Sequence, residues 1–158
     1  MIRPLNEMPS LIRSLLVDVE TEVVEYKEAK QNYDFDNIGK YFSALSNEAN
    51  LRNAECGWLL FGITNKRGVC GTAYRKEASR PSVGLRKLKQ EVAQHLNAGM
   101  TFEEIYEFDL DEKRVVAFQI PPCEFATPTT WKGVPWSREN ESLVEMPKFK
   151  LDAIYGQS

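Results

Sequence analysis

The sequence predicts one α+β domain, a small mixed or antiparallel sheet with helices packed on it. Two long segments, residues 36–51 and 82–97, repeat apolar side chains at helical spacing. Residues 102–110 and 113–120 are rich in β-forming residues and are separated by a two-residue turn, so they predict an antiparallel hairpin. That hairpin excludes a purely parallel sheet. The length of 158 residues fits a single domain over residues 1–158.

The first third of the chain is expected to form a helix, a strand and a second helix. Residues 9–16 place leucine and isoleucine side chains along one side of a short helix. Residues 22–27 have β-branched and aromatic side chains between charged ones, which indicates a strand. The helix at 36–51 is expected to begin with an aspartate cap, either Asp34 or Asp36.

The middle of the chain contains the most apolar short run. Residues 58–63 predict a buried central strand that the helices at 36–51 and 82–97 cover. The turn at 65–68 is polar and contains glycine, so it predicts a hairpin whose returning strand is 69–72.

The C-terminal part is expected to be less regular. Prolines end the hairpin after residue 120, and residues 123–140 are expected to be loop-like. Trp131 and Trp136 in this stretch either pack the loop onto the core or stack on unpaired bases. Residues 149–155 are expected to add a last helical turn.

Composition limits the function classes. A net charge of −3 and a pI near 5.3 argue against a uniformly basic DNA-binding protein, although a local patch can still bind phosphates. Cys56, Cys70 and Cys123 form no C-x-x-C pair and the chain has one histidine, so we expect reduced cysteines and no structural zinc. The sequence has no P-loop motif and no run near the roughly 20 apolar residues that span a bilayer. We therefore expect a cytoplasmic protein without a membrane partner.

Four segments share a pattern with one known family. Residues 20–27 read Glu-Thr-Glu-Val-Val-Glu-Tyr-Lys, and residues 38–50 form a helix that ends in an Ala-Asn-rich stretch. Residues 57–63 read Gly-Trp-Leu-Leu-Phe-Gly-Ile, and residues 118–142 contain Phe-Gln-Ile-Pro and later Ser-Arg. In this order they resemble the AlbA-like domain of Schlafen proteins and their bacterial relatives.

The resemblance implies a Schlafen core-like lobe that forms the N-terminal module of a longer protein. Such bacterial proteins are described as transcriptional regulators or as helicase-related ATP-binding proteins, and the domain is described as DNA-binding. In animal Schlafens two copies form a groove that binds RNA. A single copy therefore implies a homodimer in which the two strands carrying Glu25 and Lys27 line a shared groove.

The resemblance also implies a possible nuclease centre. Some family members cleave tRNA with three carboxylates, and Glu20 and Glu25 match the first two, with Lys27 beside them. The third position is Asn65, an amide that brings no charge to hold Mg²⁺ or Mn²⁺. We therefore expect no catalytic residues, no bound metal and no cofactor, with Glu20, Glu25 and Asn65 as the weak metal candidates.

The function expected from these observations is nucleic-acid binding, to either DNA or RNA. Basic residues are densest between residues 66 and 89, and clusters of this kind bind phosphate backbones. The candidate nucleic-acid-binding residues are Lys27, Lys66, Arg67, Arg75, Lys76, Arg86, Lys89 and Arg138. Two alternatives remain: a metal-dependent endoribonuclease that uses Glu20 and Glu25, and a dimerisation or sensing module that binds no nucleic acid.

Overall fold

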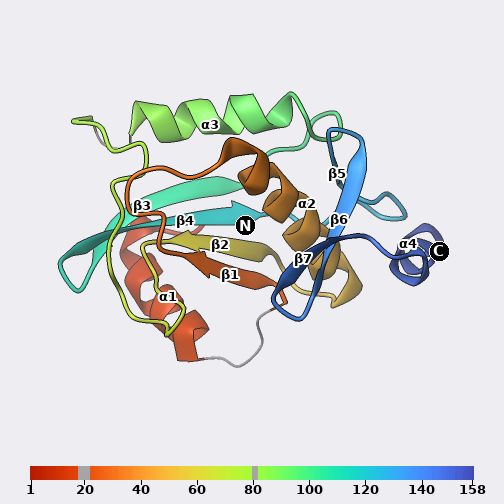
Figure 1. Cartoon of the computed structure of the whole chain (residues 1–158), viewed down its shortest axis with the longest axis horizontal. Coiled ribbons are helices and arrows are strands. Elements are labelled where there is room, and N and C mark those ends of the chain that lie inside the picture. Colours follow the sequence, from red (N-terminus) through yellow and green to blue (C-terminus); the bar gives the residue numbers. More distant parts are fainter. Residues whose placement is uncertain (18–21, 80–81) are drawn as a thin grey trace.

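The computed structural model describes residues 1–17, 22–79 and 82–158, and it has the predicted α+β architecture with two sheets (Figure 1). The helices are α1 (Met8–Val17), α2 (Phe35–Leu51), α3 (Val83–Ala93) and α4 (Lys148–Tyr155), and a 3₁₀ turn at Leu5–Glu7 precedes α1. The strands are β1 (Val24–Lys27), β2 (Gly57–Phe61), β3 (Glu104–Leu110), β4 (Lys113–Ile120), β5 (Thr130–Trp131), β6 (Val134–Glu139) and β7 (Ser142–Glu145).

The larger sheet is mixed and has the strand order β1-β2-β4-β3. Strand β1 runs parallel to β2, whereas β4 is antiparallel to both β2 and β3. Strand β2 is therefore central, as the apolar run predicted. Figure 1 shows β1 and β3 at opposite edges of this sheet, with α3 alongside β3.

Helices bury both faces of the larger sheet. Leu59 and Phe61 of β2 belong to a core cluster that includes Phe42 of α2 and Leu88 of α3. The alternate residues of β2, such as Leu60, belong to a second cluster with α1. This alternation follows from the two-residue period of a strand.

Helix α2 packs closely against the second sheet, whose strand order is β5-β6-β7. The helix begins at the Asp34 cap, whose carboxylate accepts a hydrogen bond from the Asn37 backbone N–H at 3.0 Å. A Cβ atom on Gly39 would lie 2.1 Å from ring atoms of Trp131, so only glycine lets the indole approach the helix here. The close approach explains why Trp131 is a buried packing residue.

Two expectations about regular structure were wrong. Residues 123–140 are not simply loop, because they include β5 and β6, which pair in an antiparallel hairpin. Residues 69–72 form no returning strand but only an isolated bridge between Ile63 and Val69. The backbone N–H groups of Cys70 and Gly71 both donate to the Gly62 carbonyl, and Gly71 has φ of +80°, so the strand cannot continue.

The three cysteines, which all lie in the described part of the chain, are free thiols. Burial raises the pKa of Cys56 and of Cys123 to about 11, so both stay protonated near neutral pH. None of the helices within residues 1–17, 22–79 and 82–158 has the length and apolar character needed to cross a bilayer.

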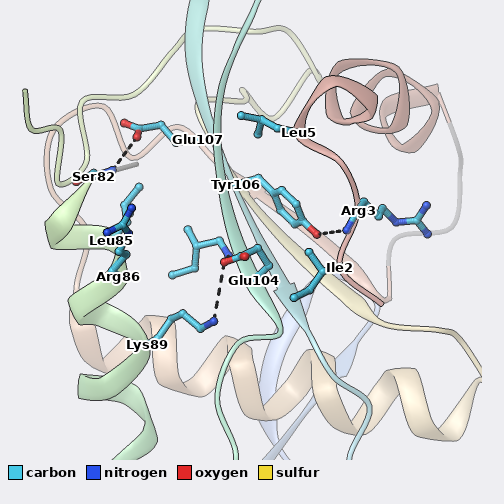
Figure 2. A pocket seen from close by; sticks show the side chains of 11 residues that line it. Ile2, Arg3, Leu5, Ser82, Leu85, Arg86, Lys89, Glu104, Tyr106 and Glu107 are labelled. Carbon is cyan, nitrogen blue, oxygen red and sulfur yellow. Dashed lines mark hydrogen bonds and ion pairs between the residues drawn. The ribbon is translucent and has the colours of Figure 1, made fainter. Parts of the chain in front are cut away.

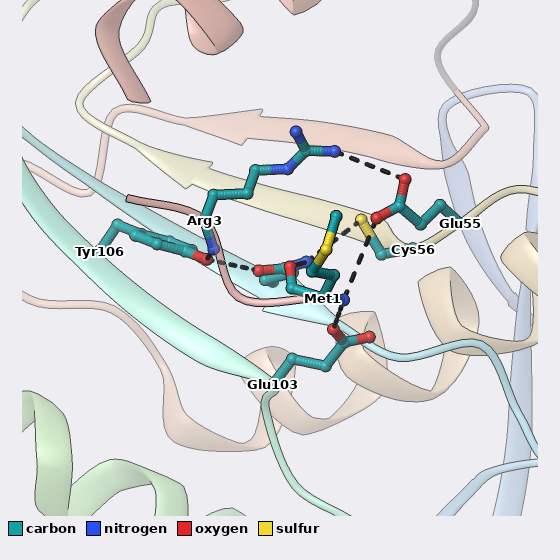
Figure 3. A network of polar contacts seen from close by, with 7 residues as sticks. Met1, Arg3, Glu55, Cys56, Glu103 and Tyr106 are labelled. Carbon is teal, nitrogen blue, oxygen red and sulfur yellow. Dashed lines mark hydrogen bonds and ion pairs between the residues drawn. The ribbon is translucent and has the colours of Figure 1, made fainter. Parts of the chain in front are cut away.

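A polar network holds the N-terminal residues across the larger sheet (Figure 3). The Met1 carbonyl accepts a hydrogen bond from Gln119 Nε2 at 2.8 Å, and the Met1 ammonium lies 2.8 Å from the Glu103 carboxylate. The Tyr106 hydroxyl donates to Gln119 Oε1 at 2.7 Å and accepts from the Arg3 N–H at 2.9 Å. These contacts fix residues 1–3 beside β3 and β4.

Candidate nucleic-acid interface

Strand β1 presents Glu25 and Lys27 on the side of the sheet that faces α2. Val24 and Tyr26 alternate with them and pack in the cluster on the α1 side. The Lys27 Nζ atom lies 3.7 Å from Glu25 Oε1 and 5.2 Å from the centre of the Tyr41 ring. Lys27 is therefore held between a carboxylate and an aromatic face at the edge of the sheet.

Arg138 of β6 reaches the same carboxylate from the second sheet. Its side chain is 0% exposed, its Nη2 lies 3.7 Å from Glu25 Oε2, and its Nη1 donates to the Val24 carbonyl at 3.3 Å. The Glu25 carboxylate thus lies between two cations, Lys27 and Arg138. A buried Arg138 joins the two sheets and presents no charge to solvent.

Glu48 of α2 is a buried carboxylate that the sequence analysis missed. It accepts hydrogen bonds from Lys150 Nζ at 2.6 Å and from the Arg138 backbone N–H at 3.1 Å. Arg52 Nε also lies 3.4 Å away, one turn along the helix. The sequence does indicate its burial, because Glu48 follows Leu45 by three residues and therefore lies on the apolar side of α2.

Three lysines beside α2 each lie over an aromatic ring, and we call Lys27, Lys40 and Lys132 the lysine row. The distances from Nζ to ring centre are 5.2 Å for Lys27 over Tyr41, 4.8 Å for Lys40 over Trp136 and 5.6 Å for Lys132 over Trp131. Their side chains are 33%, 30% and 51% exposed, so each ammonium group is accessible to solvent. Cation–π contact restrains each lysine. Three lysines share two carboxylates, Glu25 for Lys27 and Asp36 for Lys40 and Lys132.

Asp36 connects the last two members of the lysine row. Its carboxylate lies 3.7 Å from Lys40 Nζ and 2.9 Å from Lys132 Nζ, and it accepts a hydrogen bond from Trp131 Nε1 at 2.8 Å. The hydrogen bonds from Trp131 and Lys132 lower the pKa of Asp36 below its ordinary value. Asp36 therefore joins Lys40 of α2 to Lys132 of the β5–β6 turn, while Lys27 lies at the edge of the larger sheet beside Tyr41 of α2.

The other predicted basic residues lie in separate places. Lys66 is exposed at the turn after β2, and Arg67 donates to the Leu16 carbonyl at 3.2 Å, beside α1. Arg75 lies next to α3, where its Nη1 is 2.6 Å from Glu91 Oε1. Lys76 and Arg86 are exposed near this contact, and Lys89 lies 3.9 Å from Glu104. The fold brings Lys27 into the lysine row and groups Arg75, Lys76, Arg86 and Lys89 around α3.

Two of the three candidate metal ligands, Glu25 and Asn65, lie in the described part of the chain. Glu20 lies outside the described residues, and Asn65 is exposed in the turn beyond β2. Across residues 1–17, 22–79 and 82–158, no three His, Cys, Asp or Glu side chains lie close enough together to hold a metal ion. Because Lys27 and Arg138 already flank Glu25, a divalent cation would have to compete with both for that carboxylate.

We predict that the protein does not cleave tRNA or single-stranded RNA in the presence of Mg²⁺ or Mn²⁺. Hydrolysis requires a metal fixed against the attacking and leaving oxygens, and Asn65 supplies no charge for that purpose. Gel analysis of labelled RNA incubated with each ion measures this directly. Metal-dependent cleavage that disappears in Glu25→Ala would contradict the prediction. Asn65→Asp is expected to raise metal affinity in calorimetric titration.

The fold and the site define a class of small α+β lobe, with a four-stranded mixed sheet between helices and a three-stranded sheet on its longest helix. The lobe is similar to part of the DIP2311 protein from Corynebacterium diphtheriae, with a TM-score of 0.59 and 16% identity over 89% of this chain and 30% of that chain. It is also similar to the N-terminal domain of a Nitrosomonas europaea protein described as related to the ATP-dependent DNA helicase RecG. That match has a TM-score of 0.54 and 18% identity, over 93% of this chain and 91% of that domain.

The family follows from the sequence itself. The model of the family "Schlafen, AlbA_2" matches residues 20–147, and the chain belongs to this family. No curated protein matches the chain. The chain spans less than a third of the length of the Corynebacterium protein, so the activity of such longer proteins is a separate question.

Proposed function

We propose that this domain binds nucleic acid through the lysine row. The observation that carries the proposal is that three partly exposed lysines, each in contact with an aromatic ring, lie on or beside α2. Surfaces that bind single strands combine cations that contact phosphates with aromatic rings that contact bases. The relationship of a structural neighbour to a DNA helicase supports the same class of ligand.

The chemistry of this surface favours backbone binding without base-specific readout. Lysine ammonium groups contact phosphates as point charges, and their attraction to phosphates does not depend on sequence. Tyr41 and Trp131 are only 7% and 2% exposed, so Trp136, which is half-buried, is the one ring of the three that offers surface to a base. A local patch of this kind is compatible with the acidic pI near 5.3, because phosphates respond to nearby charge.

Charge reversal tests the lysine row. We expect Lys27→Glu together with Lys40→Glu to weaken binding of a fluorescein-labelled 20-nucleotide single strand by at least about tenfold, whatever its sequence. The slope of log affinity against log salt should become shallower by about one for each lost phosphate contact. Fluorescence anisotropy across a salt series measures both, with DNA, RNA and duplex versions of the same sequence.

The matched control reverses two exposed basic residues near α3, Lys76→Glu and Arg86→Glu, which change the net charge equally. Loss of binding in this control but not in the lysine-row variant would show that the α3 surface is the interface. A wild-type protein that binds none of the three probes would instead support a dimerisation or sensing module. Trp136→Leu should weaken single-strand binding more than duplex binding, because only unpaired bases can stack on the ring.

We further propose that this activity belongs to a cytoplasmic bacterial regulatory or defence protein in which the domain is one module. The family membership and the helicase-related neighbour support this setting.

We also propose that the domain acts as a homodimer. Light scattering of the domain, alone and as part of the full-length protein, measures the assembly in both settings.

A further inference from the structure

A groove of about 630 Å³ runs along the outer edge of β3, at the opposite edge of the sheet from β1. Figure 2 shows its two walls, which are α3 on one side and the N-terminal segment on the other, with β3 between them. The apolar part of the lining comes from Ile2, Leu5, Leu85 and Ile105, and two cations on α3 complete the wall, Arg86 and Lys89. Ile2 and Leu5 are 61% and 54% exposed, so the apolar surface is open to solvent.

The floor of the groove is the free edge of a strand. Within the described part of the chain β3 pairs only with β4, where Asp109 lies opposite Arg114. The Arg114 carbonyl accepts a hydrogen bond from the Thr72 N–H, on the side of β4 away from β3. The backbone groups of Asp109 therefore point to the outer edge, and by alternation so do those of Ile105 and Glu107. The Ile105 N–H donates to the Glu104 carboxylate at 3.0 Å, so Glu104 would have to release it when another strand pairs here. A strand edge of this kind is a template for another strand.

The two halves of β3 complement each other. The groove is lined by residues 104–107, where α3 contributes Arg86 and Lys89, and residues 108–110 are not part of the lining. The open half carries Asp109, the one exposed residue of β3, and leads to the acidic turn at 111–112. The walled half also contains Glu104 and Glu107, which pair with Lys89 at 3.9 Å and with Arg114 at 2.6 Å, so Arg86 adds an excess of positive charge there. The other half is open and acidic.

We propose that two copies of this chain pair through their β3 edges, antiparallel, about a two-fold axis at Glu107. In this arrangement the open half of each β3 enters the walled half of the other, so Asp109 of one copy lies opposite Ile105 of the second copy and beside its Lys89. The Glu107 carboxylates on the axis do not repel each other, because each lies 2.6 Å from Arg114 of its own chain. The contact is self-complementary, as a two-fold interface must be.

This interface differs from the one that the family resemblance implied. A shared groove would bring the two β1 strands together, whereas pairing through β3 places them at the outer edges of one continuous sheet. The two arrangements depend on different residues, which lets a mutational test separate them.

The test is a charge swap followed by sedimentation velocity over a concentration series. We expect Asp109→Lys alone and Lys89→Glu alone each to raise the dimer dissociation constant by about tenfold or more, since each places like charges in contact. The double variant should recover dimerisation, because it restores an opposite pair. Matched controls are Glu145→Lys on β7 and Lys87→Glu on α3, which lie outside the groove and should leave the constant unchanged.

Amide hydrogen exchange identifies the pairing itself. The outward N–H groups of Glu107 and Asp109 should exchange more slowly at concentrations that favour the dimer, and they should exchange quickly in Asp109→Lys. A protein that stays monomeric at several hundred micromolar would overturn the proposal. A dimer that Lys27→Glu disrupts and Asp109→Lys does not would overturn it in favour of the β1 arrangement. Failure of nucleic-acid binding has no bearing on this result.

Discussion

Gly39→Ala is expected to destabilise the fold by about 3 kcal/mol, the upper end of the range for overpacked sites. The new Cβ would lie 2.1 Å from the Trp131 ring, so the indole must move away from α2. Moving it breaks the hydrogen bond from Trp131 Nε1 to Asp36 and the edge-on contact with Phe35. Urea unfolding followed by circular dichroism measures the loss. Gly68→Ala is the control, because a Cβ atom added there would lie 3.3 Å from its nearest neighbour, the Thr64 hydroxyl oxygen, and would meet no ring.

Gly39→Ala should stabilise the protein, instead of destabilising it, when the Trp131 indole is absent. Trp131→Ala alone is expected to cost about 3–5 kcal/mol, as for other buried aromatic residues. In that background Gly39→Ala no longer meets a ring, and alanine is favoured over glycine within a helix by up to about 1 kcal/mol. If Gly39→Ala lowered the free energy of unfolding equally in the wild-type protein and in Trp131→Ala, the explanation from the Trp131 contact would be wrong.

Glu107→Ala is expected to destabilise the protein by about 3–5 kcal/mol, the usual cost of removing one partner from a buried ion pair. Its carboxylate lies 2.6 Å from Arg114 Nε, and both side chains are almost fully buried, at 3% and 6% exposure. The other carboxylate oxygen accepts a hydrogen bond from the Ser82 N–H at the start of α3. The substitution therefore leaves both a buried guanidinium and a buried amide without this acceptor.

Chemical unfolding in the Asp109→Lys background separates this effect from any change in association. Glu145→Ala removes an exposed carboxylate of β7 and should change stability by less than about 0.5 kcal/mol. A cost for Glu107→Ala as small as that of the control would show that Arg114 finds enough compensation in the Thr72 and Tyr74 carbonyls to which it also donates.

The elements that sequence predicted correctly are those that local pattern determines. The apolar stripe and aspartate cap of α2 give its start and its buried face, and the run at 58–63 gives the central strand. The β3–β4 hairpin has a two-residue turn at Asp111 and Glu112, both with positive φ as such a turn requires. In each case residues that are close together in the sequence are sufficient to predict the element.

The elements that sequence missed depend on distant partners. Strand β5 has only two residues and β6 contains Pro135. The fold stabilises them by packing on α2, where Trp131 contacts Gly39, far away in the chain. Arg138 was expected at a surface, as most arginines are, but it is buried. It pairs with Glu25 at 3.7 Å and donates one hydrogen bond to the Val24 carbonyl, whereas its Nε and Nη2 have no hydrogen-bond partner among the described residues. The lysine row combines residues from β1, α2 and the β5–β6 turn, so no single stretch of sequence shows it.

The strand order β1-β2-β4-β3 fixes how far apart the two β1 strands, and with them the two Lys27 residues, would stand in a dimer paired through β3. The joined sheet would place its two β1 strands seven strand spacings of about 4.8 Å apart, or roughly 34 Å. One helical turn of duplex DNA has nearly the same length, about 34–36 Å. Both protomers could then contact the same side of one duplex at successive turns. Tethering of this kind raises avidity through a high local concentration of the second site, without any additional contact in either protomer.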